Sequence, residues 1–268
     1  MSARWGLRGL AFGYLGLLLL APVAMIFYKT FEHGLGPPIE AMTSPDAVHA
    51  IKLTLLMVAV AVPLNTLFGV ACALLLVRHR WRGNWLVDTT INLPFAISPI
   101  VVGLALFLLY GNDGWFGPTL AEWGIQILFS WPGMVLASIF VSLPFVVREV
   151  VPVLQEIGTE QEQAASTLGA NGWQTFWRIT LPAIRWGVAY GVVLTTARVL
   201  GEFGAVTIVS GSISGETETM PLFVAKAFEQ FNEEAAYAGA IVLALLALTT
   251  LLLMSVGGRK AKSTKEAP

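Results

Sequence analysis

Residues 163–182 read QAASTLGANGWQTFWRITLP, a polar stretch that separates two long apolar runs. We expect this stretch to form two short helices that meet at a bend. Thr159 and Glu162 have the spacing of a capping box, in which two side chains at a helix start bond each other's backbone, and Asn171 and Gln174 repeat that spacing. Two helix starts so close together predict a helix–bend–helix segment between the apolar runs.

Glycine and proline set the expected limits of these two helices. Gly169 and Gly172 stand at the bend, where helix ends favour glycine. Leu181 and Pro182 are expected to close the second helix, because proline lacks a backbone donor and restricts the residue before it. One face of the first helix carries residues that would let another protein approach closely: Ala164, Ala165 and Leu168. An amphipathic linker lying on the bilayer is the alternative interpretation.

The composition excludes an ordinary soluble protein. Of the 268 residues, 56% are hydrophobic and 12% are charged, whereas soluble domains carry about 25% charged residues. The apolar residues are gathered in long runs, so we expect an integral membrane protein. The single cysteine, Cys72, excludes a disulfide within the chain.

Six apolar runs are long enough to cross a bilayer, which takes about 20 residues. They are approximately 7–28, 51–77, 86–110, 133–151, 183–209 and 235–256. With the N-terminus inside, twelve of the 16 basic residues lie on cytoplasmic segments and their borders, three lie outside and Arg198 lies within a span. This bias predicts an all-α protein with six transmembrane helices and both termini in the cytoplasm.

Proline and asparagine fall inside three of the predicted spans. We expect them to interrupt the second, third and fourth spans at Pro63, Asn65, Asn92, Pro94, Ser98, Pro99 and Pro144. Backbone groups freed inside the membrane survive only where protein or a wet cavity satisfies them. Several breaks in one chain favour a moving, solute-handling bundle over a passive scaffold.

A charged pair lies in the fifth span. Arg198 and Glu202 are four residues apart, so they share a helix face and can pair. A lone charge at this depth costs at least about 2.5–3.5 kcal/mol. Two interpretations remain: a closed ion pair that fixes helix packing, and an anion path in which Glu202 holds Arg198 or sets a gate. Small neighbours permit close helix contact or a bend. The candidate pathway or gate residues are Arg198, Gly201, Glu202, Phe203 and Gly204.

The polar stretch resembles the EAA loop of type I ABC import permeases, whose pattern is E-A-A, three residues, G, nine residues, and I-x-L-P. The glutamate position holds Gln163, with Glu162 one place early, and a neutral amide can still hydrogen-bond. The resemblance implies that the stretch is a coupling helix in a groove of a separate ATPase subunit. The residues it assigns to coupling are Glu162, Gln163, Ala164, Ala165, Leu168, Gly169, Ile179, Leu181 and Pro182.

A wider resemblance covers essentially residues 20–256. The segments GEFGAV, SGSISGET and SLPFVVREVVPVL are similar to the sulfate/thiosulfate permeases, and PFAISPIVVGL, FSWPGMV and LPAIRWGVAYGVVLT most resemble their W-type subunits. The likeness implies a type I ABC importer permease fold in a bacterial or plastid-type plasma or inner membrane. It implies a heterodimer with a T-type permease, an ATPase subunit dimer that binds ATP and Mg, and an external or periplasmic sulfate-binding protein.

The resemblance also implies a domain layout. Residues 1–50 would hold the first transmembrane helix and an outer loop, and residues 51–256 the ABC type-1 permease core. A coupling loop would occupy residues 152–182 of that core, with the ATPase contact at 159–182. Residues 257–268 would form a cytoplasmic tail.

The chain is expected to be a transport subunit rather than an enzyme. It has no GxxxxGK[ST] motif, so ATP hydrolysis must come from a partner, and we expect no cofactor, catalytic residue or metal on this chain and no nucleic-acid partner. An ATPase-independent transporter or channel would leave the EAA-type loop unexplained. An intramembrane enzyme is disfavoured because His33, His49 and His79 are scattered over different sides of the membrane. Molybdate or tungstate is the alternative cargo, since their permeases share the GEFG region.

Overall fold

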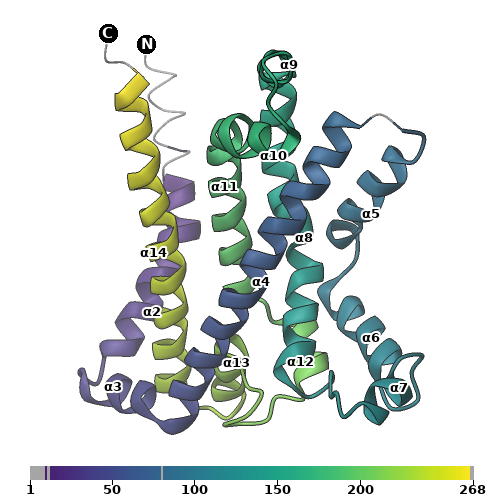
Figure 1. Cartoon of the computed structure of the whole chain (residues 1–268). Coiled ribbons are helices and arrows are strands. Elements are labelled where there is room, and N and C mark those ends of the chain that lie inside the picture. The colour runs from purple at the N-terminus through teal and green to yellow at the C-terminus, as the bar shows by residue number, and fades with distance from the viewer. Residues whose placement is uncertain (1–9, 11–12, 80, 266–268) are drawn as a thin grey trace.

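The computed structural model describes residues 10, 13–79 and 81–265. Every regular element in these ranges is a helix, which confirms the all-α prediction (Figure 1). Arg4, Arg8 and the first residues of the predicted span 7–28 lie outside the described residues, and so does Arg80.

Five helices in the described part are long and apolar enough to cross a membrane. They are Gly13–Phe31, with η1 (Gly16–Leu20) and α2 (Ala21–Phe31); α4 (Pro45–Arg78); α8 (Trp131–Ile157); Gly172–Leu200, with α10 (Gly172–Thr175), η2 (Phe176–Thr180) and α11 (Leu181–Leu200); and the apolar part of α14 (Glu233–Lys265). A sixth crossing arises when α5 (Asn84–Ala96) and α6 (Pro99–Tyr110), which meet at 111°, count as one broken span.

Short helices lie at both ends of this bundle. At one end are α3 (Gly36–Thr43), α7 (Gly117–Glu122) and α13 (Met220–Glu229), and at the other are α9 (Glu160–Thr167) and α10 (Figure 1). The last turns of α14 reach the same end as α9 and α10. Because α14 continues through Lys265, most of the predicted tail 257–268 is helical, and residues 266–268 lie outside the described residues.

The long helices expose large apolar side chains to their surroundings. Leu17, Leu67 and Leu108, for example, are 74%, 73% and 66% exposed. Apolar surface of this extent is unfavourable in water and is expected where lipid or another protein covers it. The chain is therefore a multi-pass membrane protein.

The centre of the bundle is a close contact of α4, α8 and α11 around Val146. A Cβ atom added to Gly69 of α4 would lie 2.7 Å from the Val146 Cβ, and one added to Gly191 of α11 would lie 2.8 Å from the Val146 Cα. Both positions therefore require glycine. Small residues let membrane helices approach closely enough for van der Waals packing to hold them together.

The predicted interruption of the second and fourth spans is wrong. α4 runs continuously through Pro63, and α8 runs through Pro144. The two helices are bonded to each other close to these prolines, because the Asn65 Nδ2 donates to the Ile139 carbonyl at 3.1 Å and to the Ser142 Oγ at 2.7 Å. Proline is tolerated in membrane helices when such partners are available.

Two other spans are broken. α5 ends at Ala96 and α6 begins at Pro99, as predicted for the third span. The fifth apolar run, which was predicted to be one helix to residue 209, contains a second break. α11 ends at Leu200, and α12 (Gly204–Ser210) begins after three residues. The two breaks meet, since a Cβ on Gly204 would lie 3.1 Å from the Pro99 Cβ.

Pro182 does not close a helix, contrary to the sequence prediction. The helix continues from Gly172 to Leu200 and widens locally into the π segment η2, where the Leu181 N–H donates to the Phe176 carbonyl. Pro182 follows at the start of α11. The local widening coincides with the proline, which lacks the backbone donor that a regular α-helix would use at this position.

We expect Gly69→Leu to destabilise the protein by at least about 1–3 kcal/mol, the usual penalty of overpacking. The added side chain would collide with Val146. Thermal unfolding in detergent measures the effect. Gly16→Leu is the matched control, because a Cβ on Gly16 meets nothing within 4 Å. Equal melting temperatures for the two variants would contradict the close three-helix contact.

Candidate functional site

The bend predicted between the two short helices is built on Gly169. Its φ of +84° lies in the left-handed region, where glycine carries no steric penalty. The Ala170 N–H donates to the Ala165 carbonyl at 3.0 Å and the Gly169 N–H donates to the Ser166 carbonyl at 3.0 Å. This pair of bonds is a Schellman motif, which ends α9. Gly172 has an ordinary φ and starts α10.

One of the two predicted capping boxes is present. The Gln174 N–H donates to the Asn171 Oδ1 at 2.9 Å, and the Asn171 N–H donates to the Gln174 Oε1 at 3.1 Å. The box predicted for Thr159 and Glu162 is wrong, because the Thr159 side chain makes no capping bond. Its hydroxyl oxygen instead accepts a bond from the Gln163 Nε2 at 3.1 Å.

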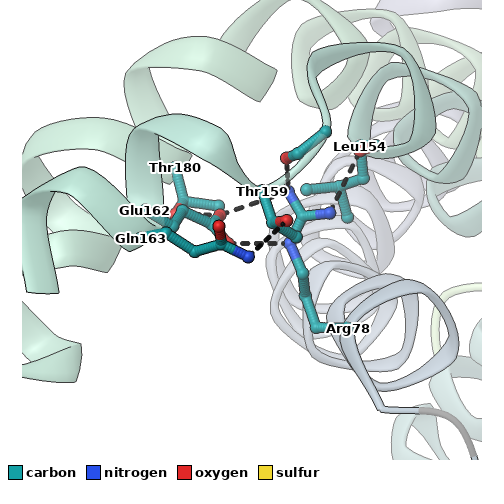
Figure 2. A network of polar contacts seen from close by, with 7 residues as sticks. Arg78, Leu154, Thr159, Glu162, Gln163 and Thr180 are labelled. Carbon is teal, nitrogen blue, oxygen red and sulfur yellow. Dashed lines mark hydrogen bonds and ion pairs between the residues drawn. The ribbon is translucent and has the colours of Figure 1, made fainter.

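Glu162 is engaged by a stronger partner, the guanidinium of Arg78 (Figure 2). The Arg78 Nε lies 2.9 Å from the Glu162 Oε2, and the Nη2 donates to the Oε1 at 3.2 Å. The Thr180 hydroxyl donates to the same Oε1 at 2.7 Å. A two-point charge-assisted contact is worth more than a neutral helix cap, which explains why Glu162 turns away from Thr159.

Sequence reasoning did not single out Arg78 as a site residue. It counts there only as one of the basic residues at a cytoplasmic border. The two partners are 84 positions apart, so no local spacing rule connects them. An arginine placed just after an apolar run, with an acidic residue in the coupling loop, is the only signal that the sequence offers.

The predicted coupling residues divide into an outward and an inward group. Leu168 is 89% exposed and Ala164 and Gln163 are exposed with it, whereas Ile179 and Leu181 are half-buried against the bundle. The outward group lies beside two exposed tryptophans that sequence reasoning did not assign to the site, Trp173 and Trp177, whose ring centroids are 5.5 Å apart. Pro182, at the start of α11, is exposed.

The charged pair inside the membrane is present. The Arg198 Nη2 lies 2.9 Å from the Glu202 Oε2, with side-chain exposures of 32% and 1%. The two residues are not on one continuous helix as predicted, because Arg198 lies in the last turn of α11 and Glu202 in the break. The second carboxylate oxygen accepts the Ala205 N–H at 3.0 Å. Both oxygens of the buried carboxylate are therefore compensated, as burial of a charge requires.

The other predicted pathway residues surround this pair. Gly201 and Phe203 lie in the break with exposed surface, and Gly204 begins α12 against Pro99. Within the described ranges, no group of three His, Cys, Asp or Glu side chains is placed to hold a metal ion. The described side chains present one partly exposed guanidinium, held by a buried carboxylate.

Comparison with known proteins places this geometry in context. Residues 65–261 match the family described as "Binding-protein-dependent transport system inner membrane component". The sulfate transport system permease protein CysW of Synechococcus elongatus is 53% identical over 250 residues, which are 93% of this chain and 87% of that protein. The protein of the same name from Escherichia coli is 47% identical over 253 residues, which are 94% of this chain and 87% of that protein.

A solved structure shares the fold. A chain of the bacterial ABC transporter involved in the import of the acidic polysaccharide alginate superimposes with a TM-score of 0.80, over 97% of this chain and 96% of that chain. The sequence identity is 19%. The likeness therefore concerns the arrangement of helices.

We expect Gly169→Ala to loosen the bend, because a Cβ in the left-handed region costs roughly 1–2 kcal/mol. Amide hydrogen exchange of the peptide covering residues 165–175 should accelerate about tenfold, since the Schellman bonds open more often. Gly172→Ala is the matched control, with equally open space but an ordinary φ. Identical exchange in the two variants would show that the bend does not depend on the glycine at 169.

Proposed function

Because the chain belongs to the family of binding-protein-dependent transport system inner membrane components, we propose that it is the W-type permease subunit of an ATP-driven sulfate importer. The observation that carries the proposal is the identity to sulfate transport permeases, which extends over more than nine tenths of the chain. The coupling loop and the membrane ion pair are the two places where such a subunit must act. Thiosulfate, which resembles sulfate in shape and charge, is the second substrate that we assign.

The topology proposed for this subunit has six crossings and both termini in the cytoplasm of a bacterial or plastid-type membrane. The α5–α6 pair runs from the end of the molecule near α9 to the end near α7, which supports its counting as one span (Figure 1). The end of α14 lies with α9 and α10. Basic residues are more frequent on the segments predicted at this end than on those at the other, which supports a cytoplasmic position for it.

The outward face of the coupling loop is proposed as the ATPase contact. Leu168 and Trp173 are 89% and 71% exposed at the end of the molecule, where apolar surface is unfavourable in water. Large apolar anchors of this kind carry much of the binding energy in protein interfaces. The ATPase dimer would bind ATP and Mg, and its closure would move the coupling loop.

The membrane ion pair is proposed to lie on the anion path. Glu202 is buried and paired, whereas Arg198 retains exposed surface, so the pair presents its positive partner. A guanidinium offers several donors in a plane, a geometry that suits oxyanions. The meeting of the two helix breaks at Gly204 and Pro99 gives the path a point at which helices can shift against each other.

The remaining partners follow from the family. We propose a T-type permease as the second half of the pathway, and an external or periplasmic sulfate-binding protein that delivers the anion. Co-purification of the tagged chain with mass spectrometry tests this assembly. A T-type permease and an ATPase are expected in the complex, and recovery of the chain without either from native membranes would argue against an ABC importer.

Leu168→Asp should release the ATPase, because a charge would replace an apolar anchor in the interface. We expect the co-purified ATPase to fall to about a tenth or less, which corresponds to at least about 1.4 kcal/mol. Gln163→Glu, which adds the same charge on α9 and restores the usual family residue, should keep the ATPase. If Leu168→Asp also retains it, the outward face is not the contact.

Arg198→Lys should lower sulfate uptake at least tenfold with partial expression, because lysine keeps the charge but loses the planar donor geometry. The exchange of the pair, Arg198→Glu with Glu202→Arg, should recover expression without uptake, since the cation has moved along the chain. Uptake of labelled sulfate into vesicles measures both. Full uptake by the exchanged protein would exclude a position-specific role in anion binding and leave only the interpretation as a structural ion pair.

A further inference from the structure

Arg78 uses all three nitrogens of its guanidinium at the junction of several helices (Figure 2). In addition to Glu162, it donates from Nη2 to the Gly158 carbonyl at 2.8 Å and from Nη1 to the Leu154 carbonyl at 3.2 Å. These two carbonyls belong to the C-terminal end of α8, where backbone acceptors lack helical partners. One side chain at the end of α4 is therefore bonded to both α8 and α9.

Glu162 extends the junction to the next segment. Its Oε1 accepts from the Thr180 hydroxyl at the end of η2, just before α11. The Arg78 and Glu162 side chains are only 12% and 20% exposed. Water screens this pair less than an exposed ion pair, whose contribution is typically below 1 kcal/mol. The cluster thus joins α4, α8, α9 and η2 at one point.

The first coupling helix has little else to hold it. None of the residues of α9 is buried. It is connected to α8 through Gly158, whose φ of +63° is that of a turn rather than a helix. A force applied to the outward face of α9 would tilt the helix about this turn unless a side chain ties it to the bundle. Glu162 provides that tie.

α4 connects this junction to the opposite end of the molecule. Its 34 residues span roughly 50 Å at 1.5 Å per residue. At the opposite end, the Met220 N–H donates to the Thr54 hydroxyl at 2.8 Å, and the His49 Nε2 lies 2.9 Å from the Glu216 carbonyl oxygen. These contacts attach α4 to α13 and to the loop that precedes it. One helix therefore joins the coupling loop to the segment that follows the membrane ion pair.

We propose that Arg78 is a positioning residue, which transmits the movement of the coupling loop to α4 and through it to the outer end of the pathway. The proposal rests on the proposed function, because it assigns a role in ATP-driven transport. Without Arg78, the ATPase would still dock on the outward face, but its movement would tilt α9 instead of displacing α4. The consequence is ATP hydrolysis that is poorly coupled to transport.

The test uses the complete importer in proteoliposomes and compares ATP hydrolysed with labelled sulfate imported. Arg78→Gln should keep the ATPase in the complex, keep hydrolysis and raise the number of ATP molecules per sulfate at least fivefold. Arg78→Lys should give an intermediate ratio, since it retains the charge but not the set of three guanidinium hydrogen bonds. Arg82→Gln, an exposed arginine beyond the same helix, should behave as the wild type.

A double-mutant comparison separates transmission from folding. If Arg78 and Glu162 act as one unit, Arg78→Gln, Glu162→Gln and the double variant should share the same ratio. Unchanged ratios in Arg78→Gln and Arg78→Lys would overturn the proposal, and so would loss of the ATPase from both, which would mean a role in assembly. A wild-type complex without ATP-dependent uptake would instead refute the proposed function.

Discussion

The contact between Arg78 and Glu162 is the constraint on which the functional arrangement depends. It joins the end of α4 to a helix that lies outside the bundle and has no buried residue of its own. Removing one partner of this partly buried pair leaves the other charge without its counter-ion, which is unfavourable. The pair therefore fixes the orientation of the coupling loop relative to the membrane helices. In the mechanism proposed above, the loop transmits movement from this fixed point.

The proposed mechanism also requires a place in the membrane where a movement of the helices changes the surroundings of Arg198. The three-helix contact around Val146 is too close to allow α4, α8 and α11 to slide freely. The two helix breaks, by contrast, meet at Gly204 and Pro99, beside a buried carboxylate that binds both Arg198 and the start of α12. Displacement there changes the surroundings of the guanidinium. In the proposed mechanism, the closely packed centre transmits the movement and the broken helices respond to it.

Local sequence rules predicted the elements that depend on local physics. The left-handed Gly169 and the capping box of Asn171 require only a few neighbouring residues, and both are present. The apolar runs located the long helices for the same reason. The resemblance to a permease family led to the proposed docking role of the coupling loop, which spacing alone left open between protein docking and lipid binding.

The remaining features depend on contacts between distant segments. Glu162 abandons its predicted cap because Arg78, far away in sequence, offers a charged partner. Pro63 leaves α4 intact, in a region where Asn65 bonds to the neighbouring helix. The fifth span breaks at residues 201–203, where the Glu202 carboxylate accepts a hydrogen bond from the start of α12. A hydropathy pattern cannot predict such a contact. Each of these outcomes required the tertiary structure.

The most direct test of the account is sulfate uptake by the purified importer in proteoliposomes. Labelled sulfate should accumulate only when ATP is on the ATPase side and the sulfate-binding protein is on the other, and excess unlabelled molybdate should not compete. Uptake by this chain without ATP, or transport of molybdate in preference to sulfate, would contradict the assignment as the permease subunit of a sulfate importer.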